Sequence, residues 1–147
     1  MPSKKILEQL IELAKTANER AARALGASRN RAQEEQGRLQ LLLDYRREYI
    51  DRFAAAARAG LDRAAWANYH QFMAKLDAAI LQQGELAAQH RESVDQRRRD
   101  WHSTNTKLKS FDTLDRRRQD AERSNERRRE QREQDEFAGR KRPTDRS

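Results

Sequence analysis

The chain has 147 residues, of which 35% are hydrophobic and 38% are charged, and its formal net charge is +8. This apolar content is too low for a large globular core, and it is typical of long helices that each bury one narrow stripe. The absence of cysteine excludes disulfides and thiolate chemistry, and no run approaches the roughly 20 apolar residues of a membrane-spanning helix.

The first predicted helix covers about residues 5–58 and carries a loose stripe of apolar and small residues. Glu8 and Glu12 interrupt its start, so we expect no signal peptide there. From residue 17 to residue 39 the stripe follows an 11-residue repeat, which predicts an unwound or slightly right-handed supercoil. Gly26 and Gly37 predict thin packing and no specific chemistry in this part. The stripe consists of Ile6, Leu10, Leu13, Ala17, Ala21, Ala24, Ser28, Ala32, Glu35, Leu39, Leu42, Arg46, Tyr49, Phe53 and Ala56.

A turn is predicted at about residues 59–62, where Gly60 and Asp62 follow an alanine-rich helix end. Glycine is favoured in the left-handed conformation that often ends a helix, and aspartate is a favoured N-cap of the next one. Because short connections favour antiparallel neighbours, this turn predicts a helical hairpin that places Phe53 beside Trp66 and Tyr69.

The second predicted helix covers about residues 63–137, and its seam repeats with steps of three and four residues from Trp66 to Phe111. This spacing keeps one side of a helix against a partner in a left-handed supercoil. We therefore predict an all-α fold, a single coiled-coil domain over residues 1–147 in which two long helices form an antiparallel coiled-coil hairpin. Pairing of two chains is an alternative for the same heptads. The seam residues are Trp66, Tyr69, Met73, Leu76, Ile80, Gln83, Ala87, His90, Val94, Arg97, Trp101, Thr104, Leu108 and Phe111.

After about residue 115 the second helix is predicted to run past its partner as an unpaired, charged overhang. Arginines and acidic residues alternate there without an apolar face, and pairs such as Arg118 with Glu122 favour a helix by a few tenths of a kcal/mol each. Residues 138–147 are predicted to be disordered.

Catalytic and metal sites find no support in the sequence. The five glycines are scattered, which excludes a phosphate-binding loop, and the three histidines lack the spacing of a metal site. We expect no enzyme activity and no cofactor. The arginine triplets at 97–99, 116–118 and 127–129 fan around a helix and alternate with acids, so a protein-facing or solvated surface is favoured over a nucleic-acid-binding one.

Four apolar or aromatic residues in the half of the hairpin near the predicted turn lie off the seam or at its edge and form an aromatic flank. They are Leu41, Tyr45, Phe72 and Ala79. Such a flank on a charged coiled coil indicates a docking site, since tyrosine is enriched at interface hot spots. A wider, better packed hairpin end is the alternative.

The residues in this region resemble the FliJ family of flagellar export proteins. The first motif is L-L-x-D-Y-x-x-E-Y, here Leu42, Leu43, Asp44, Tyr45, Glu48 and Tyr49; the second contains Trp66, Asn68, Tyr69, Phe72, Leu76, Ala79 and Ile80; the third is Asp135, Glu136, Phe137 and Ala138. The length and the position of the turn agree with the family as well, so the resemblance covers nearly the whole chain.

The resemblance implies a non-enzymatic, cytoplasmic component of the flagellar type III secretion system, which serves flagellum biogenesis and chemotaxis and has a fold similar to the central stalk of rotary ATPases. It implies three partners: the hexameric export ATPase, a transmembrane export-gate subunit and the export chaperones. Contact with the cell membrane would be peripheral and made through partners. Two rival functions remain, a chaperone-escort adaptor that does not stimulate an ATPase and a basic coiled coil that binds nucleic acid.

The resemblance also implies two sets of site residues. The gate-facing residues are Leu42, Tyr45, Tyr49, Phe72, Leu76 and Ala79. The neighbouring Arg38 and Gln83 are left out, because the family pattern has an uncharged amide and a histidine there. The contact with the ATPase ring is expected in the overhang, at Arg116, Arg117, Arg118, Arg123, Arg127, Arg128 and Phe137.

Overall fold

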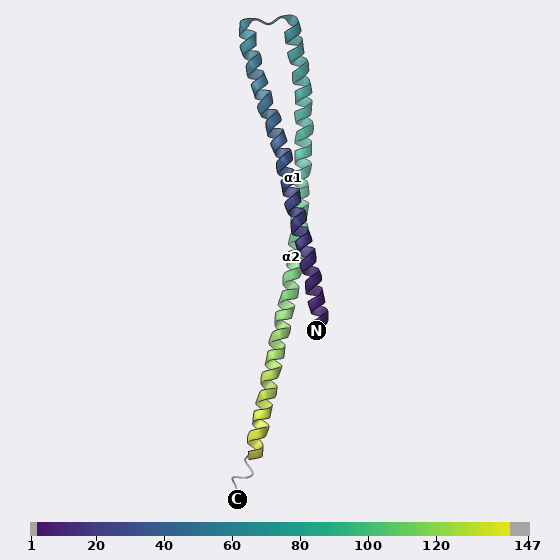
Figure 1. Cartoon of the computed structure of the whole chain (residues 1–147), viewed down its shortest axis with the longest axis vertical. Coiled ribbons are helices and arrows are strands. Elements are labelled where there is room, and N and C mark those ends of the chain that lie inside the picture. The colour runs from purple at the N-terminus through teal and green to yellow at the C-terminus, as the bar shows by residue number, and fades with distance from the viewer. Residues whose placement is uncertain (1–2, 142–147) are drawn as a thin grey trace. The chain divides into compact units, whose positions relative to one another are not determined.

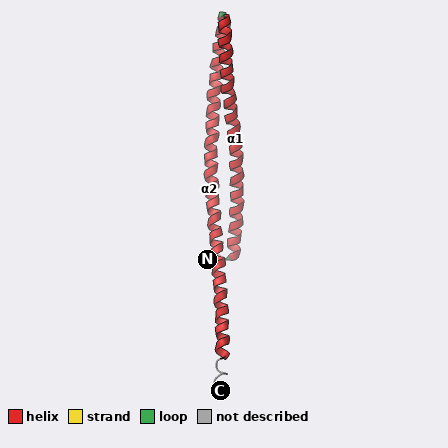
Figure 2. Cartoon of the chain, turned by 90° about the vertical axis from the view of Figure 1, so that its left-hand side faces the viewer, coloured by secondary structure: helices red, strands yellow, loops and turns green. Residues whose placement is uncertain are grey.

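The computed structural model describes residues 3–141, which form two long helices and, within that range, no strand (Figure 1, Figure 2). Helix α1 spans Lys4–Ala59 and helix α2 spans Arg63–Lys141. The two helices pack against each other in antiparallel directions, which confirms the predicted all-α helical hairpin.

Helix α2 ends later than the sequence predicts. The expectation of disorder from residue 138 is wrong for residues 138–141, which are helical, while residues 142–147 lie outside the described range. A positive charge in the last turn, here that of Arg140, stabilises a helix by its interaction with the helix dipole.

The turn between the helices has the predicted chemistry. Gly60 adopts a φ of 98°, the left-handed conformation in which a side chain would be strained. Two residues later, the Asp62 carboxylate accepts a hydrogen bond of 2.8 Å from the backbone N–H of Ala65. Asp62 is therefore the N-cap of α2, as the sequence predicts.

The contacts divide the chain into two compact units. The hairpin unit comprises residues 19–102, and the terminal unit comprises residues 3–18 together with residues 103–141. Because both helices continue from one unit into the other, the single-domain assignment stays a prediction.

The predicted seam of α2 forms much of the core of the hairpin unit. Its members Met73, Leu76, Ala87 and Val94 are buried. The exposed members in this unit are Trp66, beside the turn, and Arg97. The regular spacing of large apolar side chains therefore identified the buried side of α2.

The seam of α1 differs from the prediction. In the terminal unit Leu7 is only 1% exposed and Ala14 is buried, whereas the predicted seam residues Ile6 and Leu13 are 52% and 68% exposed. Over the first four turns of α1 the buried stripe is thus shifted by one residue, whereas from Ser28 to Phe53 it coincides with the predicted one. It repeats with unbroken steps of four and three residues, so the predicted 11-residue repeat is wrong. Its members, none of which is exposed, are Leu7, Ile11, Ala14, Asn18, Ala21, Leu25, Ser28, Ala32, Glu35, Leu39, Leu42, Arg46, Tyr49 and Phe53.

Polar pairs join the helices where the seam lacks large apolar side chains. In the hairpin unit Gln83 Nε2 donates hydrogen bonds to the Glu35 carboxylate at 2.7 Å and to the Glu35 backbone carbonyl at 2.9 Å. The Ser28 hydroxyl donates to Ser93 at 3.4 Å. In the terminal unit Thr104 donates to the Asn18 side chain at 3.1 Å. Because each pair needs its partner directly opposite, these bonds specify the register of the hairpin.

Glu35 is the most demanding of these groups, because its carboxylate is fully buried. Arg38 donates a hydrogen bond to it at 3.0 Å, and Arg31 forms a salt bridge at 3.4 Å. The prediction of no specific chemistry in this part of α1 is wrong, because a buried carboxylate is bound there by side chains of both helices. Arg38 and Gln83, the two positions that depart from the family pattern, bind this same carboxylate, which gives both a structural role in this chain.

We expect the contribution of Glu35 to stability to be lost in acid. The hydrogen bond from Gln83, helped by the charges of Arg38, Arg31 and His90, holds the pKa of Glu35 below its ordinary value of 4.5, although burial opposes this shift. A carboxyl whose pKa is lower in the folded state stabilises the fold above its unfolded-state pKa, and this stabilisation is lost as the pH falls through the folded-state value.

The measurement compares thermal unfolding of the wild type and Glu35→Gln by circular dichroism from pH 7 to pH 3. The wild type should have the higher Tm at pH 7, and the difference should shrink below about pH 4.5. A difference that stays constant over this pH range would contradict a charged Glu35 in the core.

Candidate functional site

An aromatic cluster joins α1 and α2 in the hairpin unit. Tyr49 and Phe72 have ring centroids 4.4 Å apart, and Phe53 stacks on Tyr69 at 3.5 Å. Phe53 also lies 5.3 Å from Trp66, so its predicted placement beside Trp66 and Tyr69 is confirmed. The members of the aromatic cluster are Tyr45, Tyr49, Phe53, Trp66, Tyr69 and Phe72.

The structure brings together three of the six predicted gate-facing residues. Tyr45 makes an edge contact with Phe72 at a centroid distance of 6.1 Å and lies 6.3 Å from Tyr49. Tyr45 remains 43% exposed, while Tyr49 and Phe72 are half-buried. The exposed ring of Tyr45 therefore packs against the half-buried rings of Tyr49 and Phe72. This arrangement suits a hot spot for a protein partner.

The other three predicted gate-facing residues have unequal environments. Leu76 is only 7% exposed and belongs to the core, Leu42 is half-buried on the α1 seam, and Ala79 is exposed. Tyr45, Phe72 and Ala79 each precede a seam position, and such residues lie along one side of an antiparallel helix pair. We call Leu41, Tyr45, Phe72 and Ala79 the aromatic face; Leu41, which the predicted gate set omits, is prominently exposed.

An ion pair between α1 and α2, formed by Arg46 and Asp77, lies beside the aromatic cluster. Arg46 Nε donates a hydrogen bond to Asp77 at 2.6 Å, and this bond raises the pKa of Arg46 above its usual value. The sequence predicts Arg46 as a residue of the α1 seam and assigns it no ion pair. Pairing about the turn at residue 60 places residues 46 and 77 nearly opposite each other, so opposite charges at these positions were the available signal.

The charged overhang belongs to the terminal unit and begins three residues later than predicted. Arg118 is only 9% exposed, and its guanidinium donates to Asp115 at 3.0 Å and to Glu122 at 2.8 Å. The bond to Asp115 raises the pKa of Arg118 above its usual value. Arg118 extends the seam of α2 by the steps of four and three that follow Phe111. From residue 119 to residue 140, all residues except the half-buried Ser124 are exposed.

Figure 1 shows this part of α2, in green to yellow, continuing beyond the N-terminal end of α1 within the terminal unit. The predicted ring-contact residues therefore fall into two groups. Arg118 is buried and paired at the end of the seam. The remaining members are exposed: Arg116, Arg117, Arg123, Arg127, Arg128 and Phe137.

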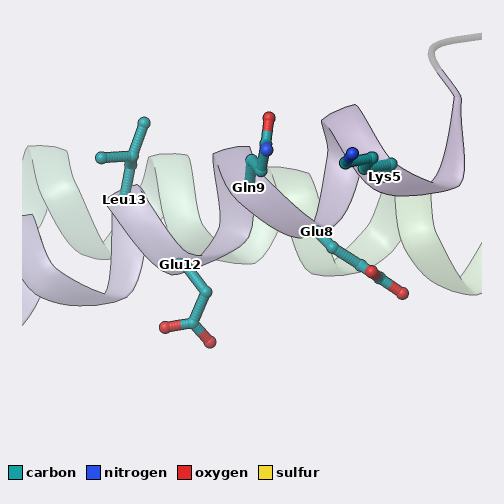
Figure 3. A pocket seen from close by; sticks show the side chains of 5 residues that line it. All are labelled: Lys5, Glu8, Gln9, Glu12 and Leu13. Atoms are coloured by element: carbon teal, nitrogen blue, oxygen red, sulfur yellow. The ribbon is translucent and has the colours of Figure 1, made fainter.

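The start of α1 presents an exposed apolar stripe that the shifted seam leaves uncovered. Ile6 and Leu13 are its most exposed members. Leu13 lines a shallow hollow on the helix surface together with Lys5, Glu8, Gln9 and Glu12. Figure 3 shows Leu13 and Gln9 projecting from one edge of the helix and Glu8 and Glu12 from the other. The terminal unit thus has an amphipathic surface on α1 as well as the charged overhang on α2.

No helix between residues 3 and 141 is both long and apolar enough to cross a membrane. Within the same residues, no group of three or more histidine, aspartate or glutamate side chains is placed to hold a metal ion.

Comparison with known proteins gives a consistent result. The sequence pattern of a family described as "Flagellar FliJ protein" matches residues 3–142 of the chain. The flagellar FliJ protein of Escherichia coli K12 is 34% identical over 134 residues, which cover 91% of each chain. The flagellar FliJ protein of Salmonella typhi has the same identity over the same coverage.

Proposed function

The chain belongs to the flagellar FliJ protein family and is a component of the flagellar export apparatus, and from this premise we propose that it acts there as a non-enzymatic stalk. In this proposal the charged overhang enters the hexameric ring of the export ATPase and promotes its assembly and activity. The aromatic face binds the transmembrane export-gate subunit, and the protein also escorts unloaded export chaperones. It works on the cytoplasmic side at the flagellar base and reaches the membrane through its partners.

The overhang is the observation that carries this proposal. A single helix with exposed charges of both signs and no apolar face has nothing to pack against in its own chain. It suits the polar lumen of a ring, where many weak ion pairs distribute the contact over several subunits. Each exposed ion pair contributes roughly 0–1 kcal/mol, so no single ion pair fixes the overhang in one position inside the ring.

The test measures ATP hydrolysis by the cognate export ATPase with the full chain and with a version that ends at Glu122. This end point keeps both partners of Arg118 and removes Arg123, Arg127, Arg128 and Phe137. We expect the full chain to stimulate hydrolysis. The stimulation by the shortened chain should be at least about fivefold smaller, because several weak charge contacts are removed together. The stimulation should also weaken as salt is raised.

A matched pair of full-length variants separates loss of charge from loss of length. Arg123, Arg127 and Arg128 are replaced by glutamine in one variant, and Arg20, Arg23 and Arg63, which lie in the hairpin unit, in the other. Only the first should reduce stimulation. If an ATPase that demonstrably forms rings is stimulated by neither the full chain nor the shortened one, the stalk function is wrong and a chaperone-escort adaptor is favoured.

A further inference from the structure

The hairpin unit has a groove that is separate from the aromatic face. It lies between α1 and α2, has a volume of about 720 Å³, and contains the small side chains of Ala32 and Val94, which are seam residues. Because these side chains are short, the two helices leave a hollow beside the seam. Among the polar residues that line the groove are Arg29, Gln33, Gln36, Arg91, Asp95 and Arg98.

The groove lies on the side of the helix pair opposite to the aromatic face. Arg29, Gln33 and Gln36 each follow a seam position of α1, and Arg91, Asp95 and Arg98 each follow a seam position of α2. Residues of the aromatic face precede seam positions instead. In an antiparallel pair, residues that follow the seam face one another on one side and residues that precede it on the other. A ligand in the groove would therefore leave Tyr45 and Phe72 accessible.

The groove carries a net positive charge, and hydrogen bonds orient two of its three arginine side chains. Three arginines face one acid, Asp95. Arg91 donates a hydrogen bond to the Gln36 side chain at 3.0 Å, and Arg98 donates to Asp95 at 3.4 Å. Arginine binds carboxylates through two parallel hydrogen bonds, and side chains that are already oriented lose less entropy on binding.

We propose that this groove binds an acidic helical segment of a protein partner. A hollow between two antiparallel helices accepts a third helix along its length, and the arginines match carboxylates on such a helix. Further toward the turn, the same side carries Leu43 and Leu81, which are exposed and follow seam positions, so the bound helix would meet apolar as well as basic surface. Nucleic acid fits less well, because Asp95 and the glutamine side chains interrupt the basic surface that phosphates require.

The test uses a fluorescent synthetic helix of about three heptads, with leucine at the seam positions and glutamate at the flanking ones. Binding to the full chain is followed by fluorescence anisotropy. The triple variant Arg29→Glu, Arg91→Glu, Arg98→Glu should weaken binding at least about tenfold, because charge-assisted bonds are replaced by repulsion. The control variant Arg20→Glu, Arg23→Glu, Arg63→Glu has the same net charge and should weaken it less than about threefold, since its charges lie away from the groove and are screened.

Circular dichroism of both triple variants establishes that the helices are retained. Equal loss of binding in the two variants would overturn the proposal in favour of general electrostatic attraction, and absence of binding to the wild type would overturn it directly. A DNA duplex of about 16 base pairs serves as the other probe. If the duplex binds more tightly than the peptide at about 0.15 M salt and responds to the groove variant, the groove binds nucleic acid and the proposal is wrong.

Discussion

Replacing Leu76 by alanine is expected to lower the free energy of unfolding by about 2–4 kcal/mol, because the leucine is 7% exposed and its removal leaves a cavity in the core of the hairpin unit. Chemical denaturation followed by circular dichroism measures this loss. Tyr45→Ala is the matched control in the same predicted gate-facing set, and it should cost less than about 1 kcal/mol, since much of the ring is open to solvent.

This comparison separates structural residues from contact residues in the predicted gate-facing set. Loss of partner binding in Leu76→Ala would follow from a disrupted core, whereas loss in Tyr45→Ala would report a direct contact. An unfolding free energy that is unchanged in Leu76→Ala would mean that the seam of α2 does not pack as described.

The double variant Tyr45→Ala, Ala79→Glu is expected to weaken binding to the cytoplasmic domain of the export-gate subunit by at least about 30-fold. Both side chains are exposed on the aromatic face, so the variant removes an aromatic anchor and introduces a charge with little effect on the core. Loss of a tyrosine hot spot alone is worth about 2 kcal/mol or more in binding free energy, which corresponds to this factor. Isothermal titration calorimetry with the purified domain gives the affinity.

The control variant Leu43→Ala, Leu81→Glu makes comparable changes on the opposite side of the same unit. Both leucines are exposed and both follow seam positions, so this variant should bind the gate domain with unchanged affinity. If both double variants lose affinity to the same extent, the aromatic face is not the gate site. Normal affinity of the Tyr45→Ala, Ala79→Glu variant would lead to the same conclusion.

Much of the hairpin could be predicted from the sequence because the signals involved are local. The N-cap at Asp62 and the left-handed Gly60 depend on residue types within one turn. The seam of α2 was predicted because large apolar side chains repeat along one side without a competing stripe. The aromatic cluster followed from the position of the turn, which sets the residues that face each other across the hairpin.

The start of α1 shows where local signals were insufficient. Two adjacent stripes are apolar there, one with Ile6 and Leu13 and the other with Leu7 and Ala14. Hydrophobicity favours neither, and only packing against α2 shows that the second is buried. The false 11-residue repeat has the same origin, because tracing the wrong stripe at the start of α1 required an extra step of four residues to reach Ser28, from which the two stripes coincide.

The polar residues of the seam were beyond sequence reasoning for a related reason. Glu35 reads as a weak point in a hydrophobic stripe, and its meaning depends on Gln83, 48 residues away. Arg118 likewise reads as one charge among many in the overhang, although it is buried and completes the seam. The amino-acid sequence alone thus determined that the chain is a helical hairpin, where it turns and which side of α2 is buried, because these depend on spacing and turn chemistry. The tertiary structure decided the buried side of α1 near its start, the partners of the buried charges and the point at which the overhang begins, because each depends on which residues of the two helices face each other.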